Sequence, residues 1–183
     1  MMASSNIATA IAVLALAIAL LLALYLSTLL RLGKESGNVK ARTYFWKFKS
    51  REDAEEWIMA HGLAPAKVTR DGLTSKVVGF DPYLHSPEVR IVGKQQRRIV
   101  IGLKVEGNVT ALKVYWVTQD SPLWGEDKAM EIPIKADGVL HEYVIEVGKH
   151  PLWKGVITRF RLDLEPANCY NTVFSISYIK YPC

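Results

Sequence analysis

An uninterrupted apolar run near the N-terminus constrains this chain more than any other feature. Residues 7–30 (IATAIAVLALAIALLLALYLSTLL) contain no charge, no proline and no glycine over 24 positions. At about 1.5 Å of helical rise per residue the run reaches roughly 36 Å, which exceeds a hydrocarbon core of about 30 Å. Because every helical face is apolar, the run predicts a single transmembrane helix rather than a helix of a soluble core.

A cleaved signal peptide is the alternative interpretation of this run. Such a peptide has a basic n-region, an apolar core of about 7–15 residues and a small-x-small cleavage site. Here the segment MMASSN contributes only its α-amino charge, and the run ends in the bulky sequence YLSTLL. These features favour an uncleaved, single-pass anchor whose residues 7–30 contact membrane lipid.

The sequence gives conflicting indications of membrane orientation. Four basic residues follow the run: Arg31, Lys34, Lys40 and Arg42. Because basic residues tend to stay on the cytoplasmic side of a membrane, they predict a cytoplasmic C-terminal domain. The sequon N-V-T at Asn108 is a candidate glycosylation site, which requires the opposite side. Mainly because of the family resemblance described below, and also because of this sequon, we expect an extracytoplasmic domain. The basic flank is at odds with that expectation.

The rest of the chain fits one tethered domain. Residues 31–42 (RLGKESGNVKAR) are polar and include two glycines, which predicts a short flexible tether. Residues 43–183 are long enough to bury one substantial core. The net charge of +5 is modest and the basic residues are interleaved with acidic ones, so we expect no nucleic-acid partner.

The two cysteines, Cys169 and Cys183, flank a predicted strand. Residues 173–181 have the pattern of a strand, whose length at about 3.3 Å per residue separates its ends by roughly 30 Å. A disulfide requires Cα atoms within about 7 Å of each other. An internal bond therefore needs a loop that folds far back, and two free thiols or a bond to another chain are the alternatives.

Most of the domain follows the period-two alternation of β-strands. It opens with the aromatic run TYFWKF at residues 43–48, and Ser50 with Asp53 then marks the start of one short helix that Gly62 ends. Beyond Pro65, apolar and polar residues alternate between turn signals. About nine or ten short strands with polar outer faces predict two packed antiparallel sheets, an all-β sandwich of jelly-roll type.

Five segments with recognisable motifs occur in order along the domain. They are FDPYLHSP at 80–87, IVIGLK at 99–104, YWVT at 115–118 followed by Trp124, DGVLHEYVI at 137–145 and HPLWKGVITRFRLD at 150–163. Together they resemble a galactose-binding-like, carbohydrate-binding-module-like jelly roll over residues 44–181. The resemblance implies a β-sandwich fold, a carbohydrate ligand and a place outside the cell.

One position departs from that family pattern. Relatives often have an acidic residue in the last strand that helps to bind a structural calcium ion, and this chain has Ser177 there. Calcium prefers six to eight oxygen ligands with several carboxylates among them. We therefore expect no metal and no other cofactor.

Sugar recognition needs aromatic faces that stack on the C–H surface of a pyranose, and planar polar groups that bond its hydroxyls. Trp124 is the first candidate because it lies in a polar loop, where no core role requires it. Arg159 and Arg161 project from one strand face and can grip hydroxyls or a carboxylate. The remaining candidate ligand contacts are Tyr83, His85, Tyr115 and Trp153.

Each candidate also has an ordinary structural explanation. Trp153 can simply pin its loop, His85 can satisfy backbone groups of a turn, and the two arginines can pair with strand carboxylates. Three further tryptophans are expected in the core: Trp46, Trp57 and Trp116.

Catalytic signatures are missing from the sequence. It contains no G-x-S-x-G, H-E-x-x-H or C-x-x-C motif and no phosphate-cradling glycine loop. A glycosidase needs two carboxylates about 5–10 Å apart, and no such pairing is signalled by Asp120, Glu126, Asp127 and Asp163. We therefore expect a non-catalytic module for cell-surface glycan binding or adhesion. The alternative is an accessory subunit of a membrane or envelope complex, in which the sandwich docks protein partners and the alanine-rich helix packs against other helices.

Overall fold

The computed structural model describes residues 16–28 and 43–181 of this chain, which divides into two compact units, Met1–Lys40 and Ala41–Cys183. In the first unit, residues 16–28 form a helix. Within the described part of the chain, no helix combines the length and the apolarity needed to cross a membrane. The expected span, residues 7–30, extends beyond the described helix at both ends, and the expected tether, residues 31–42, lies outside the described residues.

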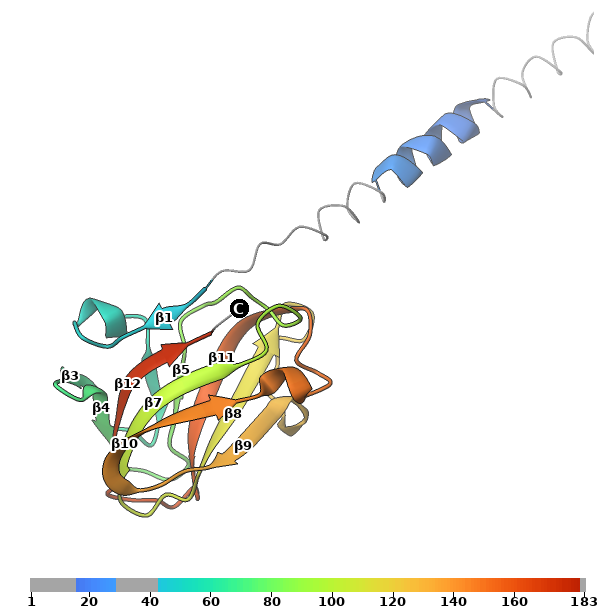
Figure 1. The fold of residues 1–183 in the computed structure, drawn as a ribbon. Coiled ribbons are helices and arrows are strands. Elements are labelled where there is room, and N and C mark those ends of the chain that lie inside the picture. Colours follow the sequence, from blue (N-terminus) through green and yellow to red (C-terminus); the bar gives the residue numbers. More distant parts are fainter. Residues whose placement is uncertain (1–15, 29–42, 182–183) are drawn as a thin grey trace, which may run out of the picture. The chain divides into compact units, whose positions relative to one another are not determined.

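The second unit is a sandwich of two antiparallel sheets, as the alternation in the sequence predicts (Figure 1). The strands of sheet A are β1 (Phe45–Trp46), β3 (Lys67–Thr69), β4 (Gly72–Lys76), β7 (Ile99–Glu106), β10 (Asp137–Ile145) and β12 (Val173–Lys180). Their order is β10-β7-β12-β4-β3, and β1 also pairs with β12.

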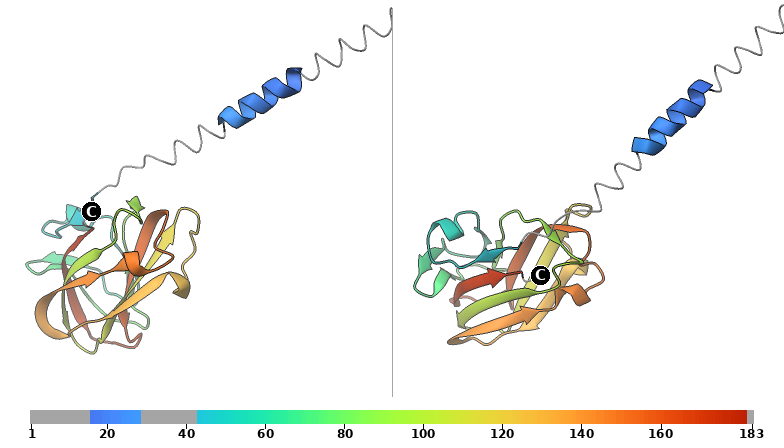
Figure 2. Two further views of the ribbon diagram at one scale, coloured as in Figure 1. Left: turned by 45° about the vertical axis from the view of Figure 1, so that its right-hand side comes forward. Right: turned by 45° about the horizontal axis from the view of Figure 1, so that its top comes forward.

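The second sheet packs against the first, and two further directions show the same pair of layers (Figure 2). The strands of sheet B are β2 (Ile58–His61), β5 (Tyr83–His85), β6 (Ile91–Val92), β8 (Ala111–Thr118), β9 (Ala129–Pro133) and β11 (Val156–Glu165). Their order is β2-β5-β11-β8-β9, and β6 also pairs with β11. The expected all-β sandwich is therefore confirmed.

Alternate side chains of the long strands fill the space between the sheets. None of the following core residues of β7, β8 and β11 is more than 3% exposed: Ile99, Ile101, Leu103, Val105, Leu112, Val114, Trp116, Phe160, Leu162 and Leu164. Trp57 is also buried, and Trp46 is half-buried against the same core. Because these side chains point inward, their neighbours at the next position along each strand lie on the outer side of the sheet, although Val100, Tyr115 and Asp163 among them are also buried.

The short helix expected after Ser50 is a single 3-10 turn, η1 (Glu52–Ala54). Asp53 Oδ2 accepts hydrogen bonds from the backbone N–H groups of Lys49 and Ser50, at 2.9 and 3.1 Å, which closes the turn. Trp57 then enters the core and the chain continues as β2, which pairs with β5. Burial of the indole and strand pairing override the local helical pattern.

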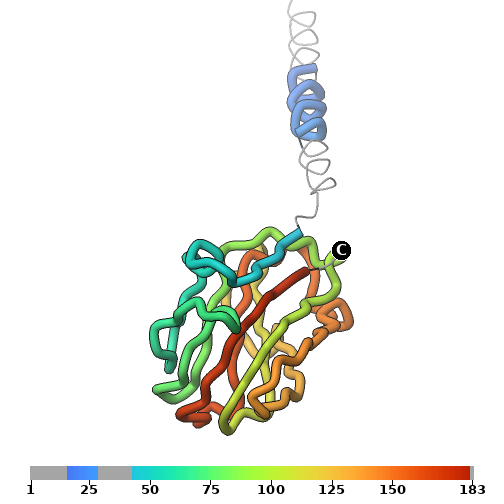
Figure 3. Tube along the Cα trace, turned by 60° about the vertical axis from the view of Figure 1, so that its left-hand side comes forward, coloured from blue at the N-terminus to red at the C-terminus, as the bar shows by residue number. Residues whose placement is uncertain are grey.

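The last strand departs from regular alternation at one point. Figure 3 shows β12 in red along the sheet, and its register against β7 shifts between Ile176 and Tyr178. Phe174, Ile176 and Ile179 are buried, whereas Tyr178 is half-buried on the outer side. This bulge is the reason that the sequence of β12 shows no clean split between an apolar and a polar face.

Cys169 is fully buried, and its thiol is free. Its Sγ lies 3.8 Å from the carbonyl oxygen of Leu164. Cys183 lies outside the described residues, so the alternatives for the second cysteine stay predictions.

Candidate functional site

Three strands of sheet B present aromatic and charged side chains side by side on the outer face. Strand register places Arg161 of β11 between His85 of β5 and Tyr115 of β8. Two residues further along β11, Asp163 lies beside Tyr83 of β5. We define the aromatic face as this outward-facing group together with one loop residue: Tyr83, His85, Tyr115, Trp124 and Arg161.

Arg161 is held at the centre of the aromatic face by stacking and by an ion pair. Its Cζ lies 4.4 Å from the ring centroid of Tyr83 and 4.2 Å from that of Tyr115, so the guanidinium lies between two rings. Its Nε and Nη2 donate to the two carboxylate oxygens of Asp163, at 2.8 and 2.6 Å. The Asp163 side chain is only 3% exposed. Asp163 therefore positions Arg161 rather than reaching a ligand itself.

Burial also changes the acid–base behaviour of two groups here. It raises the pKa of the Asp163 carboxyl to about 6, although the Arg161 guanidinium opposes the shift. Burial, with the nearby charges of Arg161 and Arg159, lowers the pKa of His85. At neutral pH the centre of the face thus contains a carboxylate paired with a guanidinium, beside a neutral imidazole.

One carboxylate ties the loop between β8 and β9 to the edge of this face. Glu126 begins the 3-10 turn η2 (Glu126–Lys128). It accepts hydrogen bonds from Lys113 Nζ and from the Tyr115 hydroxyl, each at 2.5 Å. These hydrogen bonds lower the pKa of Glu126, which stays ionised and keeps the loop attached at neutral pH.

A buried lysine fixes the other part of the same loop. Lys128 is 5% exposed, and its Nζ donates to the carbonyl oxygens of Ser121 and Leu123, at 3.0 and 2.7 Å. Ser121 Oγ accepts from the same ammonium at 2.6 Å. Trp124 follows Leu123 directly. The hydrogen bonds of Lys128 therefore fix the loop segment that carries the indole.

Trp124 ends a row of four rings on the outer side of sheet B. Neighbouring ring centroids in the order His61, Tyr83, His85 and Trp124 are separated by 5.5, 5.4 and 5.2 Å. Tyr83 and His85 are nearly parallel to each other, with an angle of 18° between their planes. Their faces are therefore partly covered by neighbouring rings, and the half-buried Trp124 occupies the open end of the row.

An open hollow of about 220 Å³ lies beside Trp124. Pro122 and Val117 line it with apolar surface, and Arg159 and Glu88 line it with charge. Arg159 Nη2 and Glu88 Oε1 are 3.5 Å apart at the rim. The hollow thus combines an indole wall with groups that can donate and accept hydrogen bonds.

Six of the seven candidate residues therefore lie on the outer side of sheet B or at its rim, although Tyr115 among them is only 4% exposed, and Trp153 does not. Trp153 is 4% exposed, its ring centroid lies 5.2 Å from that of Trp116, and its Nε1 donates to the carbonyl oxygen of Gln96 at 2.7 Å. Trp153 pins its loop to the core and is not part of the aromatic face. Asn108, the candidate glycosylation residue, is exposed beyond the end of β7.

Sequence reasoning missed the polar partners of the aromatic face. It treated Asp163 and Glu126 as ordinary acids and did not single out Lys113 or His61 as site residues. The available signal was the R-L-D spacing, which places Arg161 and Asp163 on the same strand face. No sequence pattern indicated the contact of Glu126 with β8, because the conformation of the loop between β8 and β9 brings Glu126 to that strand.

No metal site is found within residues 16–28 and 43–181, where no three His, Cys, Asp or Glu side chains are grouped to hold an ion. Ser177, at the position where relatives often have an acid, donates its hydroxyl to the carbonyl oxygen of Asp71 at 2.7 Å.

Comparison with known proteins shows similarity in structure rather than in sequence. No protein-family model and no curated protein matches the sequence. A low-affinity xylan-binding module of family 86 from Roseburia intestinalis superimposes with a TM-score of 0.50 and 12% identity, over 79% of this chain and 96% of that chain. A carbohydrate-binding module of family 29 reaches a TM-score of 0.53 and 11% identity, over 78% of this chain and 89% of that chain. This chain has the fold of carbohydrate-binding modules.

A variant of the family 29 module complexed with cellulohexaose gives the same TM-score of 0.53, at 10% identity over 79% of this chain and 92% of that chain. The jelly-roll fold that the sequence motifs imply is therefore confirmed. At such low identity the likeness concerns the fold, and the chemistry of the aromatic face rests on its own geometry.

Proposed function

We propose that this chain is a non-catalytic carbohydrate-binding module and that its aromatic face contacts the glycan. The observation that supports this proposal is the outward-facing cluster of rings around Arg161. The cluster stands on a fold shared with modules described as binding xylan or as complexed with cellulohexaose.

The residues of the aromatic face offer different kinds of contact to a sugar. Trp124 offers an indole beside an open hollow, where the C–H face of a sugar ring can stack. Arg161 engages Asp163 through Nε and Nη2, which leaves Nη1 to donate to sugar hydroxyls. Tyr83 stacks on the guanidinium and adds a hydroxyl that can donate to or accept from a sugar hydroxyl.

The state of the two nearest carboxylates supports binding without hydrolysis. A glycosidase needs one carboxyl as acid and another as nucleophile or base, both facing the substrate. Asp163 is buried under Arg161, and Glu126 is engaged by Lys113 and Tyr115. Neither carboxyl is placed to protonate a glycosidic oxygen or to attack a sugar.

Replacing Trp124 tests the proposal. The full-length protein is screened on a broad glycan array, and affinities for the best ligand are then measured by titration. Trp124→Ala is expected to weaken binding at least about tenfold, because it removes the stacking surface at the hollow. Leu123→Ala, in the same loop and 77% exposed in the wild type, is the matched control and should bind as the wild type does. Absence of any glycan ligand, or equal affinity of Trp124→Ala, would contradict the proposal.

The proposal also places the module at the outer surface of a membrane, in adhesion or envelope contact. The apolar run at residues 7–30 and the sequon at the exposed Asn108 support this location, and the basic residues after the run are at odds with it. Protease added to intact cells is expected to degrade the module. Protection until the membrane is permeabilised would show that the module is cytoplasmic.

A further inference from the structure

A second hollow, of about 500 Å³, lies on sheet A, the other layer of the sandwich. It is lined by Phe45 and Lys47 from β1 and the segment after it, by Arg70 from the turn before β4, and by Leu140 and Tyr178 from β10 and β12. Sheet A contributes no residue to the aromatic face. The two hollows are therefore separate features of the fold.

The floor of this second hollow includes a tyrosine ring that lies flat on the sheet. Tyr178 of β12 is paired in register with Gly102 of β7, which is paired in turn with Glu142 of β10. A Cβ on Gly102 would lie 2.5 Å from the Tyr178 ring, so the ring passes directly over the glycine. The Tyr178 hydroxyl donates to Glu142 Oε2 at 2.5 Å, on the far side of β7. One face of the ring thus covers the Gly102 backbone and the other faces outward.

Two apolar side chains stand beside this platform. Phe45 meets the Tyr178 ring edge-on, with centroids 6.3 Å apart and planes at 89°. Phe45 is 53% exposed and Leu140 is 50% exposed. An upright phenyl group and a leucine beside a flat phenol ring form the kind of surface on which the C–H face of a sugar ring stacks.

The charged lining of the hollow is predominantly basic. Lys47, Lys49 and Arg70 line it, and among the described residues none of the three side chains forms an ion pair, although the Asp71 carboxylate lies within electrostatic reach of Arg70. The one carboxylate in the lining, Asp71, accepts from Lys104 Nζ at 2.7 Å. The cations therefore carry charge that the hollow itself does not neutralise.

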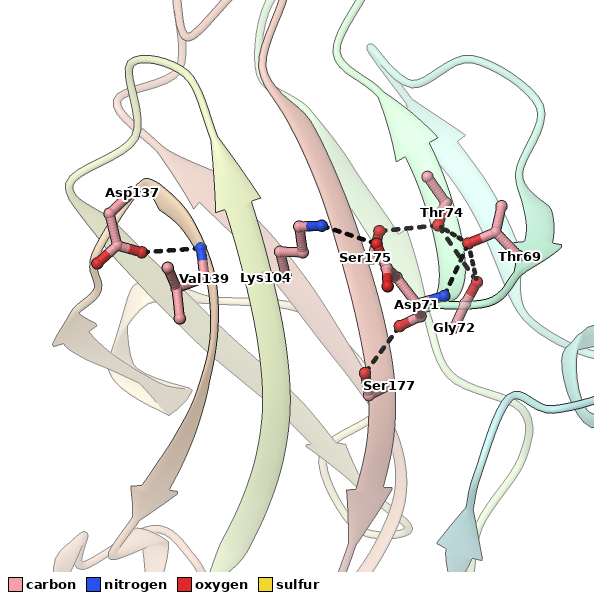
Figure 4. A network of polar contacts seen from close by, with 9 residues as sticks. All are labelled: Thr69, Asp71, Gly72, Thr74, Lys104, Asp137, Val139, Ser175 and Ser177. Atoms are coloured by element: carbon pink, nitrogen blue, oxygen red, sulfur yellow. Dashed lines mark hydrogen bonds and ion pairs between the residues drawn. The ribbon is translucent and has the colours of Figure 1, made fainter.

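A network of hydrogen bonds holds the wall that contains Arg70 and Asp71 (Figure 4). Ser177 Oγ donates to the carbonyl oxygen of Asp71 at 2.7 Å. The hydroxyls of Thr69 and Thr74 are 2.8 Å apart, and Thr74 and Ser175 are likewise 2.8 Å apart. The turn before β4 is thereby fixed against β12, and the hollow keeps its shape without a ligand.

We propose that this hollow is a second binding site, which takes an acidic saccharide unit, a sugar ring bearing a carboxylate or a sulfate. The ring stacks on Tyr178 between Phe45 and Leu140, and the anionic group pairs with Lys47, Lys49 and Arg70. The neighbouring Lys180, whose Nζ lies 5.4 Å from the Tyr178 centroid and 3.4 Å from Glu142 Oε2, lies at the edge of the ring and adds to the cationic rim. This site stands on its own residues and does not depend on the aromatic face.

The test is calorimetric titration of the full-length protein with oligogalacturonate and with a neutral galacto-oligosaccharide of the same length. The acidic ligand is expected to bind at least about tenfold more tightly, with an affinity that falls as salt is added. Tyr178→Ala and the pair Lys47→Ala with Arg70→Ala should each weaken this binding at least about fivefold. Tyr178→Phe should retain it, because the hydroxyl is directed at Glu142. Tyr170→Ala, which alters another exposed tyrosine outside the hollow, is the matched control.

Gly102→Ala provides a second test that keeps every ligand-contacting side chain. The added methyl group would lift the Tyr178 ring from the sheet, so binding of oligogalacturonate should fall while the thermal unfolding transition stays cooperative. Equal affinity for the neutral and acidic ligands would overturn the proposal. So would binding to vesicles containing an anionic lipid, sensitive to the same variants, with no binding of the acidic sugar. Trp124→Ala reports on the aromatic face and Tyr178→Ala on this hollow, so failure of one proposal is distinguishable from failure of the other.

Discussion

Replacing Arg161 with methionine is expected to lower the free energy of unfolding by about 3 kcal/mol at pH 8. The substitution keeps the aliphatic bulk between Tyr83 and Tyr115 but leaves the Asp163 carboxylate, 3% exposed, without its two charge-assisted hydrogen bonds. Chemical denaturation monitored by tryptophan fluorescence measures the loss. Adding Asp163→Asn to the same chain should restore most of it, because the buried charge is then removed.

The pH dependence gives this prediction a definite sign. The pKa of Asp163 in the folded protein, about 6, lies above the ordinary value of 3.8. Protonation of Asp163 therefore stabilises the fold, and this contribution is fully present below about pH 4 and is lost as the pH rises through about 6. The wild type should accordingly gain stability relative to Asp163→Asn as the pH falls from 7 towards 4. The cost of Arg161→Met should be smaller at pH 5 than at pH 8.

Arg159→Met is the matched control for Arg161. Arg159 lies on the same strand face, but its contact with the exposed Glu88 is 3.5 Å long, so its loss should cost less than about 1 kcal/mol. Equal losses for the two arginines at pH 8, or a loss for Arg161→Met that does not change between pH 8 and pH 5, would contradict the account of the centre of the face.

Gly72→Ala is expected to destabilise the module by about 3 kcal/mol or more. Gly72 begins β4 with a φ of +113°, and a Cβ there would overlap the carbonyl oxygen of Ile176 and lie 2.7 Å from Ser177 Cα. Both contacts are with the backbone of β12, which cannot move aside as a flexible side chain can. Thermal and denaturant-induced unfolding measure the loss.

Gly138→Ala separates the backbone clash from the backbone conformation. Gly138 has a φ of +72°, but the nearest atom to its added Cβ, Glu106 Oε2, is 3.9 Å away. This variant should therefore cost only about 1 kcal/mol, the penalty for the left-handed conformation. If Gly72→Ala lowered the free energy of unfolding no more than Gly138→Ala does, that result would contradict the close packing of the β3–β4 turn on β12.

The sandwich could be predicted from the sequence because its long strands alternate strictly. In β8 and β11 the inward residues are apolar and the outward residues include Tyr115, Arg159 and Arg161, so period two assigns each residue to a side of the sheet. It does not show that Tyr115 on the outer side is itself buried. In β12 the bulge at Ile176–Tyr178 breaks the alternation, and the sequence alone could not tell which side Tyr178 faces. The sequence also could not show that the expected short helix is only one turn long, because the burial of Trp57 in the core ends it and this packing depends on the folded structure.

The candidate site was predictable where a residue type was unusual for its place. Trp124 in a polar loop could be found in this way. Trp153 could not be distinguished from it, because its burial depends on packing against Trp116 and on a hydrogen bond to Gln96, residues far from it in the sequence. The partners Glu126 and Lys113 come together only through the folded loop.

The indole N–H signals of the five tryptophans in a nitrogen-15 NMR titration with the array-selected glycan test the central claim most directly. We expect the Trp124 signal to shift with ligand concentration, while the signals of the buried Trp57, Trp116 and Trp153 stay in place. Glycan binding that leaves the Trp124 signal unmoved would contradict the assignment of the aromatic face as the carbohydrate site.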